Sequence, residues 1–258
     1  MLKTALSNDG VFSITLANPP ANALSEAMIE RLTNEIETLD EAARVIVIGH
    51  EGKLFSAGHD IKEMTARRSD PDNGRAFFEM VMGKCANLMQ AVVHAKVPVI
   101  AKVDGLATAA GCQLVASCDL AYATSGSRFC TPGVNIGLFC STPMVALSRN
   151  VHRKHAMEML LVGEELPAEK AVEFGLINEI VDVESLDARV ESVAQTIASK
   201  SKYVLEIGKR AFYEQAEMSL SNAYDHCAAV MVRNMMARDA EEGLGAILEK
   251  RTPVWSDS

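Results

Sequence analysis

The sequence contains no uninterrupted apolar stretch of about 18 residues, the length that a membrane-spanning helix requires, so we expect no membrane partner. Basic residues are also scarce, because 25 Lys and Arg stand against 34 Asp and Glu, giving a net charge of −9 over 258 residues. No stripe of Lys and Arg with interleaved aromatic residues is present. We therefore expect no nucleic-acid partner, although a local basic cluster is compatible with a small phosphorylated ligand.

The sequence has no C-x-x-C pair, and its cysteines are interpreted as free thiols of a reducing compartment rather than a disulfide framework. They are Cys85, Cys112, Cys118, Cys130, Cys140 and Cys227. No metal ion is expected, because His152 and His155 have no carboxylate or thiol obviously paired with them. The N-terminal stretch has neither a signal-peptide pattern nor an Arg-rich transit peptide. A cytoplasmic location is therefore expected, with the mitochondrial matrix as the alternative if a mature form has lost a transit peptide.

Strand-like and helix-like segments alternate over the first half of the chain. The expected strands are Val11–Leu16, Val45–Ile48, Val97–Val103 and Leu120–Ala123, and the expected helices follow Ser25 and cover 77–93 and 109–117. The fully apolar run VIVI at Val45–Ile48 is typical of a strand that is buried on both faces. This alternation predicts an α/β fold with a parallel sheet and crossover helices.

After about Ser141 the pattern becomes helical, with breaks near Gly163, Gly175 and Lys200. A short strand around Ile177–Val181 is the expected exception. We therefore predict an α/β core over residues 1–200 and a helical C-terminal region over 201–258.

The stretch Gly105–Ala121, GLATAAGCQLVASCDLA, consists almost entirely of small residues around one long amide, Gln113. It follows a predicted buried strand, and a helix is expected to begin near Ala109. The first turn of a helix has unpaired N–H groups with partial positive charge, and small side chains let a ligand approach them. Such amides can stabilise an oxyanion. Tight packing of a helix on the sheet is the alternative, since it also selects Ala and Gly.

The stretch Leu54–Met64, LFSAGHDIKEM, follows another buried strand in the same way. Gly58 allows a turn, and Asp60 is a candidate helix cap. Two N–H groups from separate strand ends that converge on one oxygen would form an oxyanion hole. The His59 side chain is a candidate for proton transfer, and the alternative is that it simply points to solvent.

Four motifs in order make the chain resemble the crotonase superfamily, also called the enoyl-CoA hydratase/isomerase family, including its enoyl-CoA hydratase domain-containing proteins. FSAGHDIKEM and VDGLATAAGCQLVASCDLAYA are similar to the two oxyanion-hole segments of that family. EGLGAILEKRTPVW is similar to its C-terminal helix signature, and GEELPAEKAVEFGLINEIV also fits the family. The resemblance implies a spiral of ββα units followed by a helical trimerisation region. We therefore expect a homo-oligomer, either a trimer or a hexamer.

The resemblance also implies a shared chemistry, in which two backbone N–H groups stabilise the enolate of an acyl-CoA thioester. Matched by motif, these donors are the amides of His59 and Ala110. No cofactor is implied beyond the coenzyme A of the substrate. The substrate-binding candidates are Ala57, Gly58, His59, Asp60, Ile61, Lys62, Ala110, Cys140, Ser141 and Lys250. Lys62 and Lys250 would reach the phosphates and nucleotide of coenzyme A, unless each is a solvated surface charge.

Two positions depart from the hydratases of the family, which use two glutamates to move protons to and from water and Cα. Gln113 stands at the place of the first glutamate and Gly133 at the place of the second. A primary amide orients a group but exchanges no proton near neutral pH. Each general acid or base typically contributes about 100- to 10,000-fold. The sequence therefore predicts that ordinary two-glutamate hydration is weak or absent.

Three interpretations of the altered site remain open. The chain is an acyl-CoA enzyme with other catalytic groups, for which Cys140 and Ser141 are candidates because several family branches place an Asp nearby. Alternatively, bound bicarbonate replaces the carboxylate, as in the naphthoyl synthases of the family, and Gly133 leaves the space for it. In the third interpretation, the protein binds acyl-CoA without turnover.

Overall fold

The computed structural model describes residues 1–258, and a six-stranded sheet in the order β1-β2-β3-β5-β7-β10 lies at its centre. The strands are β1 (Leu2–Leu6), β2 (Val11–Leu16), β3 (Val45–His50), β5 (Val99–Val103), β7 (Leu120–Thr124) and β10 (Glu179–Val181). β1 pairs with β2 in antiparallel orientation, with Leu2 opposite Leu16. All other neighbours in this sheet are parallel, with Ile46 opposite Val99 in the β3–β5 pair.

Three of the central strands are each followed by a short strand, and these short strands form a second sheet in the order β4-β6-β8-β9. Its strands are β4 (Leu54–Ser56), β6 (Leu106–Thr108), β8 (Arg128–Cys130) and β9 (Leu166–Pro167). The helical segments after the first three are α2 (Ile61–Ala66) and α3 (Arg75–Val93), then α4 (Ala110–Ser117), then the 3₁₀ helix η2 (Pro132–Ile136) and α5 (Pro143–Asn150). This repetition confirms the expected spiral of ββα units.

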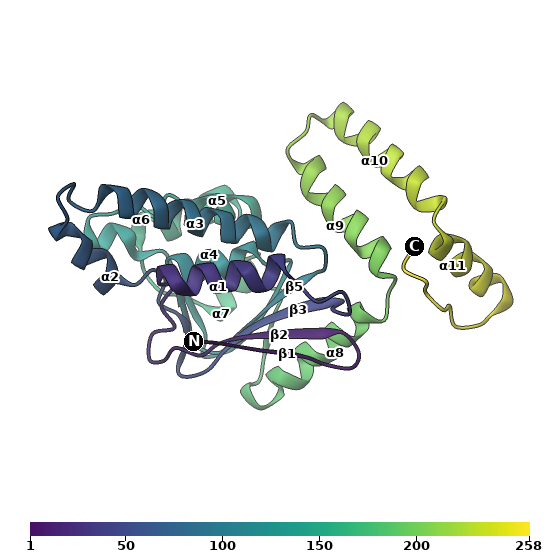
Figure 1. Cartoon of the computed structure of the whole chain (residues 1–258), viewed down its shortest axis with the longest axis horizontal. Coiled ribbons are helices and arrows are strands. Elements are labelled where there is room, and N and C mark those ends of the chain that lie inside the picture. The colour runs from purple at the N-terminus through teal and green to yellow at the C-terminus, as the bar shows by residue number, and fades with distance from the viewer.

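Different helices cover the two faces of the large sheet (Figure 1). α1 (Glu26–Glu37), α3 and α4 lie on one face, and α8 (Leu186–Ala198) lies on the other. Because side chains alternate along a strand, Ile46 and Ile48 belong to the main core, whereas Val45 and Val47 pack toward α8. The apolar run in β3 is explained by this burial on both faces.

The second half of the chain is mostly helical, as predicted. Its remaining helices are α6 (Arg153–Val162), α7 (Ala168–Glu173), α9 (Lys202–Ala216), α10 (Leu220–Met235) and α11 (Arg238–Glu249). α9 is fixed to the core by Lys209, whose Nζ donates to Asp119 Oδ2 at 2.7 Å and to the carbonyls of Val92 and Val97. α10 and α11 extend away from the sheet (Figure 1). The predicted boundary at residue 200 falls between α8 and α9, and the division into two domains stays a prediction.

The predicted elements are found, with shifts at their ends. Ser25 caps α1, because its Oγ accepts the Met28 N–H at 3.3 Å. The strand predicted from Val97 begins at Val99, the first residue of the segment that is paired with β3, opposite Ile46. The strand expected over 177–181 covers only 179–181, and the helix expected from residue 109 begins one residue later.

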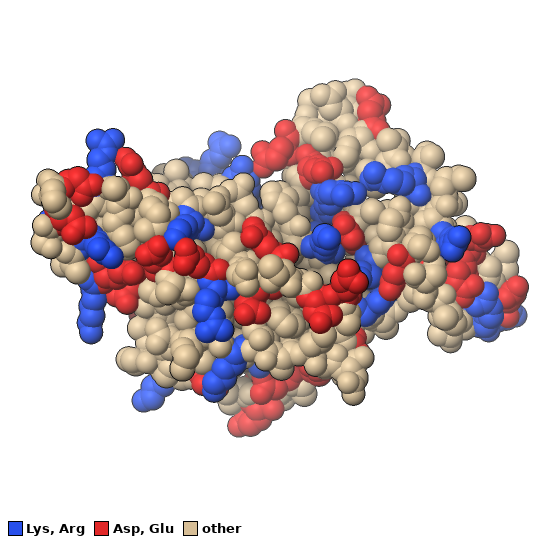
Figure 2. Space-filling view, viewed as in Figure 1, with Lys and Arg blue, Asp and Glu red and all other residues tan.

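None of the helices has the length and apolar character needed to cross a membrane. Figure 2 shows basic and acidic side chains interspersed over the visible face, without a continuous basic stripe.

Candidate functional site

The first candidate segment lies between β4 and α2. Asp60 is the N-cap of α2, and its Oδ1 accepts the N–H groups of Lys62 at 2.9 Å and Glu63 at 3.2 Å. Gly58 has φ +79°, which glycine adopts without a side-chain clash. The turn and the cap together fix the backbone on either side of His59.

The direction of the His59 N–H is set by the peptide unit to which it belongs. The carbonyl of Gly58 accepts the Leu24 N–H at 2.8 Å, in a parallel bridge between Leu24 and His59. In a trans peptide the C=O and N–H point in opposite directions, so the His59 N–H points away from Leu24. It donates no hydrogen bond to any group of the chain.

The second candidate segment is the start of α4. Ala110 is the first residue of this helix, and its N–H donates no hydrogen bond within the chain, as expected for a first helical turn. The preceding Ala109 has φ +51° and ψ −120°, a conformation that costs a non-glycine residue about 1–3 kcal/mol. Its N–H donates to the Cys130 carbonyl at 2.9 Å, which helps to hold this strained turn. Strain of this kind is common at functional sites.

The two segments are in direct contact. A Cβ atom added to Gly58 would lie 3.0 Å from the Ala110 nitrogen and 2.9 Å from the Ala109 Cβ. A Cβ atom added to Gly111 would lie 2.5 Å from the Ser56 carbonyl oxygen. The small residues of both stretches are therefore needed for this close approach, which brings the backbone immediately before His59 next to the Ala110 nitrogen.

Gln113 is buried in α4, one turn beyond Ala110. Only 3% of its surface is exposed, and its Oε1 has no hydrogen-bond partner. A buried acceptor without a partner typically costs about 1–3 kcal/mol. The fold alone does not explain this amide, which supports its place among the candidate site residues.

Gly133, in η2, has no free space at the position where a side chain would begin. A Cβ atom added there would lie 2.9 Å from the Cys140 sulfur and 3.2 Å from the Cys140 nitrogen. The chain returns after η2 so that the Cys140 side chain fills the position where a side chain at 133 would start. This contact counts against the bicarbonate interpretation, which stays a prediction.

The thiols around Gly133 are poor proton donors and nucleophiles at neutral pH. Burial raises the pKa of Cys112 and, with a smaller opposing effect of the Gly133 N–H, the pKa of Cys140. Cys140 is 8% exposed, whereas Ser141 is exposed and donates its hydroxyl to the Phe139 carbonyl at 3.3 Å. Neither side chain has a base that would activate it among its hydrogen-bond partners.

The His59 side chain does not point freely to solvent, which corrects that alternative. Both ring nitrogens are buried and have no hydrogen-bond partner that meets normal geometry. Burial lowers the pKa of His59, so the ring is neutral at pH 7. A neutral imidazole can in principle exchange a proton, and its role stays a hypothesis.

The structure brings most, but not all, of the predicted site residues together. The residues from Ala57 to Lys62 form one continuous segment beside Ala110, and Ile61 is 57% exposed. Lys250 is the C-cap of α11, which lies at the opposite end of the molecule from α2 (Figure 1). Within one chain, Lys250 therefore does not reach the segment that was predicted to bind coenzyme A.

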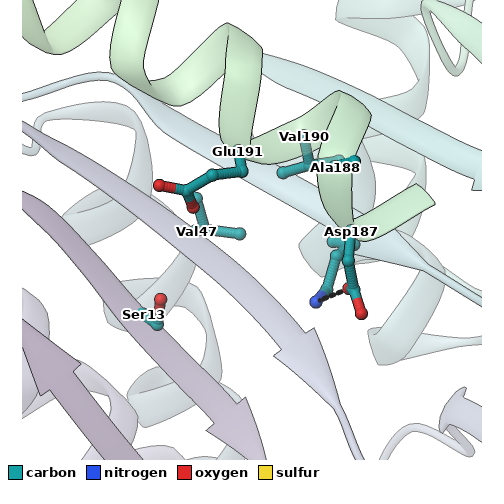
Figure 3. A pocket seen from close by; sticks show the side chains of 7 residues that line it. Ser13, Val47, Asp187, Ala188, Val190 and Glu191 are labelled. Carbon is teal, nitrogen blue, oxygen red and sulfur yellow. Dashed lines mark hydrogen bonds and ion pairs between the residues drawn. The ribbon is translucent and has the colours of Figure 1, made fainter. Parts of the chain in front are cut away.

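A separate hollow of about 380 Å³ lies between α8 and strands β2 and β3 (Figure 3). It is lined by Ser13, Val47, Lys102, Asp187, Ala188, Val190 and Glu191. Lys102 is paired with Asp187 at its rim. None of the predicted site residues lines this hollow, so it is distinct from the candidate site.

One residue at the site was not singled out in the sequence. Asn22 is fully buried at φ +43° and bonds to the connection between β3 and β4. The only sequence signal is an asparagine shortly after Pro19 and Pro20, which indicates a turn but not its neighbours in space.

Comparison with known proteins places the chain in a family. The model of the enoyl-CoA hydratase/isomerase family matches residues 7–258. Enoyl-CoA hydratase domain-containing protein 3, mitochondrial, of Rattus norvegicus is 46% identical over 258 residues, which cover 99% of this chain and 84% of that protein. The crystal structure of an enoyl-CoA hydratase of Mycobacterium smegmatis is 46% identical, with a TM-score of 0.93 and 98% coverage of both chains. The human enoyl Coenzyme A hydratase domain-containing protein 3 gives a TM-score of 0.92 at 45% identity, with 98% of this chain and 99% of that chain covered. The chain therefore belongs to the enoyl-CoA hydratase/isomerase family, the crotonase superfamily.

Proposed function

We propose that this protein binds an acyl-CoA thioester and that the N–H groups of His59 and Ala110 hold its carbonyl oxygen. The observation that carries the proposal is that both N–H groups lack a hydrogen-bond acceptor in the chain and belong to two segments in contact. Two preorganised donors stabilise an oxyanion more than a neutral carbonyl, so they favour the enolate of the thioester over its ground state. The family acts on acyl-CoA thioesters, which gives the substrate class.

The proposed site polarises the thioester but has no carboxylate at positions 113 and 133, where the hydratases of the family have theirs. Gln113 accepts or donates hydrogen bonds and so orients a water molecule or the acyl group, without exchanging a proton near pH 7. Gly133 offers no side chain, and the adjacent Cys140 thiol has its pKa raised by burial. Each such group is typically worth about 100- to 10,000-fold, and groups that act together are not additive, so hydration is expected to be at least about 100-fold slower than in a two-glutamate hydratase.

The infrared spectrum of crotonyl-CoA that carries carbon-13 at the thioester carbonyl tests the proposed donors. The carbonyl stretch of the bound ligand is expected at lower frequency than that of free ligand, because two N–H groups polarise the bond. A thioether analogue without the carbonyl is the matched control and is expected to bind more weakly. An unchanged carbonyl frequency in a demonstrably bound complex would overturn the proposal.

A second candidate function is binding of acyl-CoA without turnover. It is favoured by the amide at Gln113 and by the buried thiols of Cys112 and Cys140, whose raised pKa values keep them protonated at neutral pH. Incubation with a panel of acyl-CoA thioesters, followed by mass spectrometry, separates the two functions. Product formation of any kind (hydration, hydrolysis, decarboxylation or isomerisation) supports an enzyme, and binding with no product supports a carrier or sensor.

We further propose that the functional form is a homo-oligomer, a trimer or hexamer, assembled through the C-terminal helices. Apolar side chains are exposed on α10 and α11: Met231, Val232, Met235, Leu244, Ile247 and Leu248. Exposed apolar surface of this kind commonly marks an interface. A second copy would also be needed to bring a Lys250 toward coenzyme A. Light scattering on the purified protein measures the assembly, and a monomer would contradict it.

The cellular location remains a proposal. The rat and human relatives are named mitochondrial, which favours the matrix over the cytoplasmic location expected from the sequence. Localisation of the full-length tagged protein in its own cells distinguishes the two.

A further inference from the structure

Asn22 is a buried polar residue whose side-chain amide joins its own loop to the segment that leads to the first candidate donor. Its Nδ2 donates to the carbonyls of Glu51 at 2.8 Å and Leu54 at 2.9 Å, so it bridges the connection between β3 and β4. Its Oδ1 accepts the Asn18 N–H at 2.8 Å. Both N–H donors and the carbonyl of the side-chain amide are therefore used, at a residue with no exposed surface.

A second set of bonds runs from the backbone of Asn22 to Gly58. The Ser56 hydroxyl donates to the Asn22 carbonyl at 2.8 Å, and Ser56 Oγ in turn accepts the Gly58 N–H at 3.2 Å. The Ala57 N–H donates to the Ala21 carbonyl at 2.9 Å. The loop over 17–24 thus holds both residues that precede His59.

The last contact of the loop acts on the peptide unit that carries the proposed donor. The Leu24 N–H binds the Gly58 carbonyl at 2.8 Å, and Leu24 itself is fully buried. Because the peptide unit is planar and trans, fixing this carbonyl also fixes the direction of the His59 N–H. A rotation of this unit would redirect the donor without removing it.

We propose that Asn22 is a positioning residue that orients the His59 N–H toward the thioester carbonyl. Its side chain holds the loop over 17–24 on the β3–β4 connection. The loop in turn holds the N–H of Gly58 through the Ser56 hydroxyl and the carbonyl of Gly58 through the Leu24 N–H. The inference rests on the proposed function, because the orientation matters only if His59 is a donor. A donor moved by about 1 Å is enough to reduce catalysis up to about 100-fold, so the network sets activity as well as stability.

The variant Asn22→Asp tests the role of the side chain. It keeps the shape and the acceptor but loses both N–H donors to Glu51 and Leu54. The expected result is a smaller infrared shift of the bound thioester carbonyl and weaker binding of crotonyl-CoA by about tenfold, with the Kd for coenzyme A alone unchanged within about twofold. Ser56→Ala is the second variant, since it removes only the hydroxyl between Asn22 and Gly58.

Asn150→Asp is the matched control, because Asn150 Nδ2 also donates to two carbonyls, those of Ala116 and Ala146, away from the first segment. It should leave the carbonyl shift unchanged.

A wild-type protein with no shift contradicts the proposed function itself. A wild-type shift that persists in both Asn22→Asp and Ser56→Ala overturns the positioning role, as does an equal loss in Asn150→Asp. Failure of both test variants to fold would assign the network to stability alone and also overturn it.

Discussion

The sulfur of Cys140 occupies the position where a side chain at Gly133 would begin, 2.9 Å from an ideal Cβ. Contacts to a real Cβ atom are essentially never that short, so one of the two groups has to move when position 133 gains a side chain. Position 133 therefore lacks a carboxylate, and the Cys140 side chain fills the space where its side chain would begin.

We expect Gly133→Ala to lower the free energy of unfolding by about 1–3 kcal/mol, the usual cost of overpacking a buried site. Adding Cys140→Ala should recover part of that loss, because it removes the sulfur. Urea denaturation of the single and double variants measures the coupling. Gly208→Ala is the control, since nothing lies within 4 Å of its Cβ position in α9, and it should be stabilising by about 0.5–1 kcal/mol. Purely additive effects at 133 and 140 would contradict the steric explanation.

The same contact determines how hydration could be restored. Gln113→Glu with Gly133→Glu supplies both carboxylates but places the second against Cys140. Hydration of crotonyl-CoA is therefore expected to rise more when Cys140→Ala is added to this pair than with the pair alone. The initial rate of loss of the enoyl absorbance measures it. No rise in the triple variant would show that the two positions were wrongly matched to the glutamates.

Gln113→Met is expected to leave stability unchanged or to raise it by up to about 2 kcal/mol. Methionine has a similar shape and removes a buried Oε1 that has no partner. Acyl-CoA binding or turnover should fall in the same variant, because the amide that would contact the ligand is gone. Residues that serve a site often lower stability in this way. Ser117→Ala is the comparison, since its buried hydroxyl does have a partner, the Gln113 carbonyl at 2.8 Å, and its loss should destabilise. A strongly destabilised Gln113→Met would mean that the amide is structural.

The cysteines should differ sharply in their reaction with iodoacetamide at pH 7.5. Five are buried and only Cys227 is partly exposed. Burial raises the pKa of Cys85 from 9.0 to about 11, so its reactive thiolate is scarce at that pH. Mass spectrometry should find Cys227 alkylated first, and the other five only after unfolding. Alkylation of Cys140 as fast as Cys227 would instead indicate an accessible, activated thiol.

The C-terminal tail should be sensitive to acid through Asp257. Arg44 Nη1 and Nη2 donate to its carboxylate at 2.7 and 3.0 Å, and these bonds hold the pKa of Asp257 below 3.8. A lowered pKa means that the unfolded chain binds this proton more readily, so stability is present above pH 3.8 and is lost as the pH falls through the folded value. The difference in unfolding free energy between wild type and Asp257→Asn should therefore shrink between pH 5 and pH 3.

Denaturant titrations across that range measure the difference, and Glu51→Gln is the control. Glu51 pairs with Lys3 on the surface, where both side chains are largely exposed, so its loss should change little at any pH. A difference between wild type and Asp257→Asn that does not vary with pH would rule out the ion pair as its source.

Several features of the fold followed from local pattern. The apolar run at Val45–Ile48 and the cap at Ser25 predicted a buried strand and a helix start, because both depend on neighbours in sequence. The three-residue strands β4, β6 and β8 were not predicted, because three residues are too few to show a period of two. The antiparallel β1 was also missed, since its side chains are mostly exposed and carry little hydrophobic pattern.

By itself the sequence determined the family, through it the expectation of a ββα spiral, and the identity of the residues at the candidate positions, including an amide at Gln113 and no side chain at Gly133. These are properties of single positions and short motifs. Only the tertiary structure decided that Cys140 fills the space beside Gly133, and that Asn22 and Leu24 hold the peptide before His59. Such contacts join segments that are distant along the chain, and their geometry follows from how the strands and returning loops pack, which no local pattern encodes.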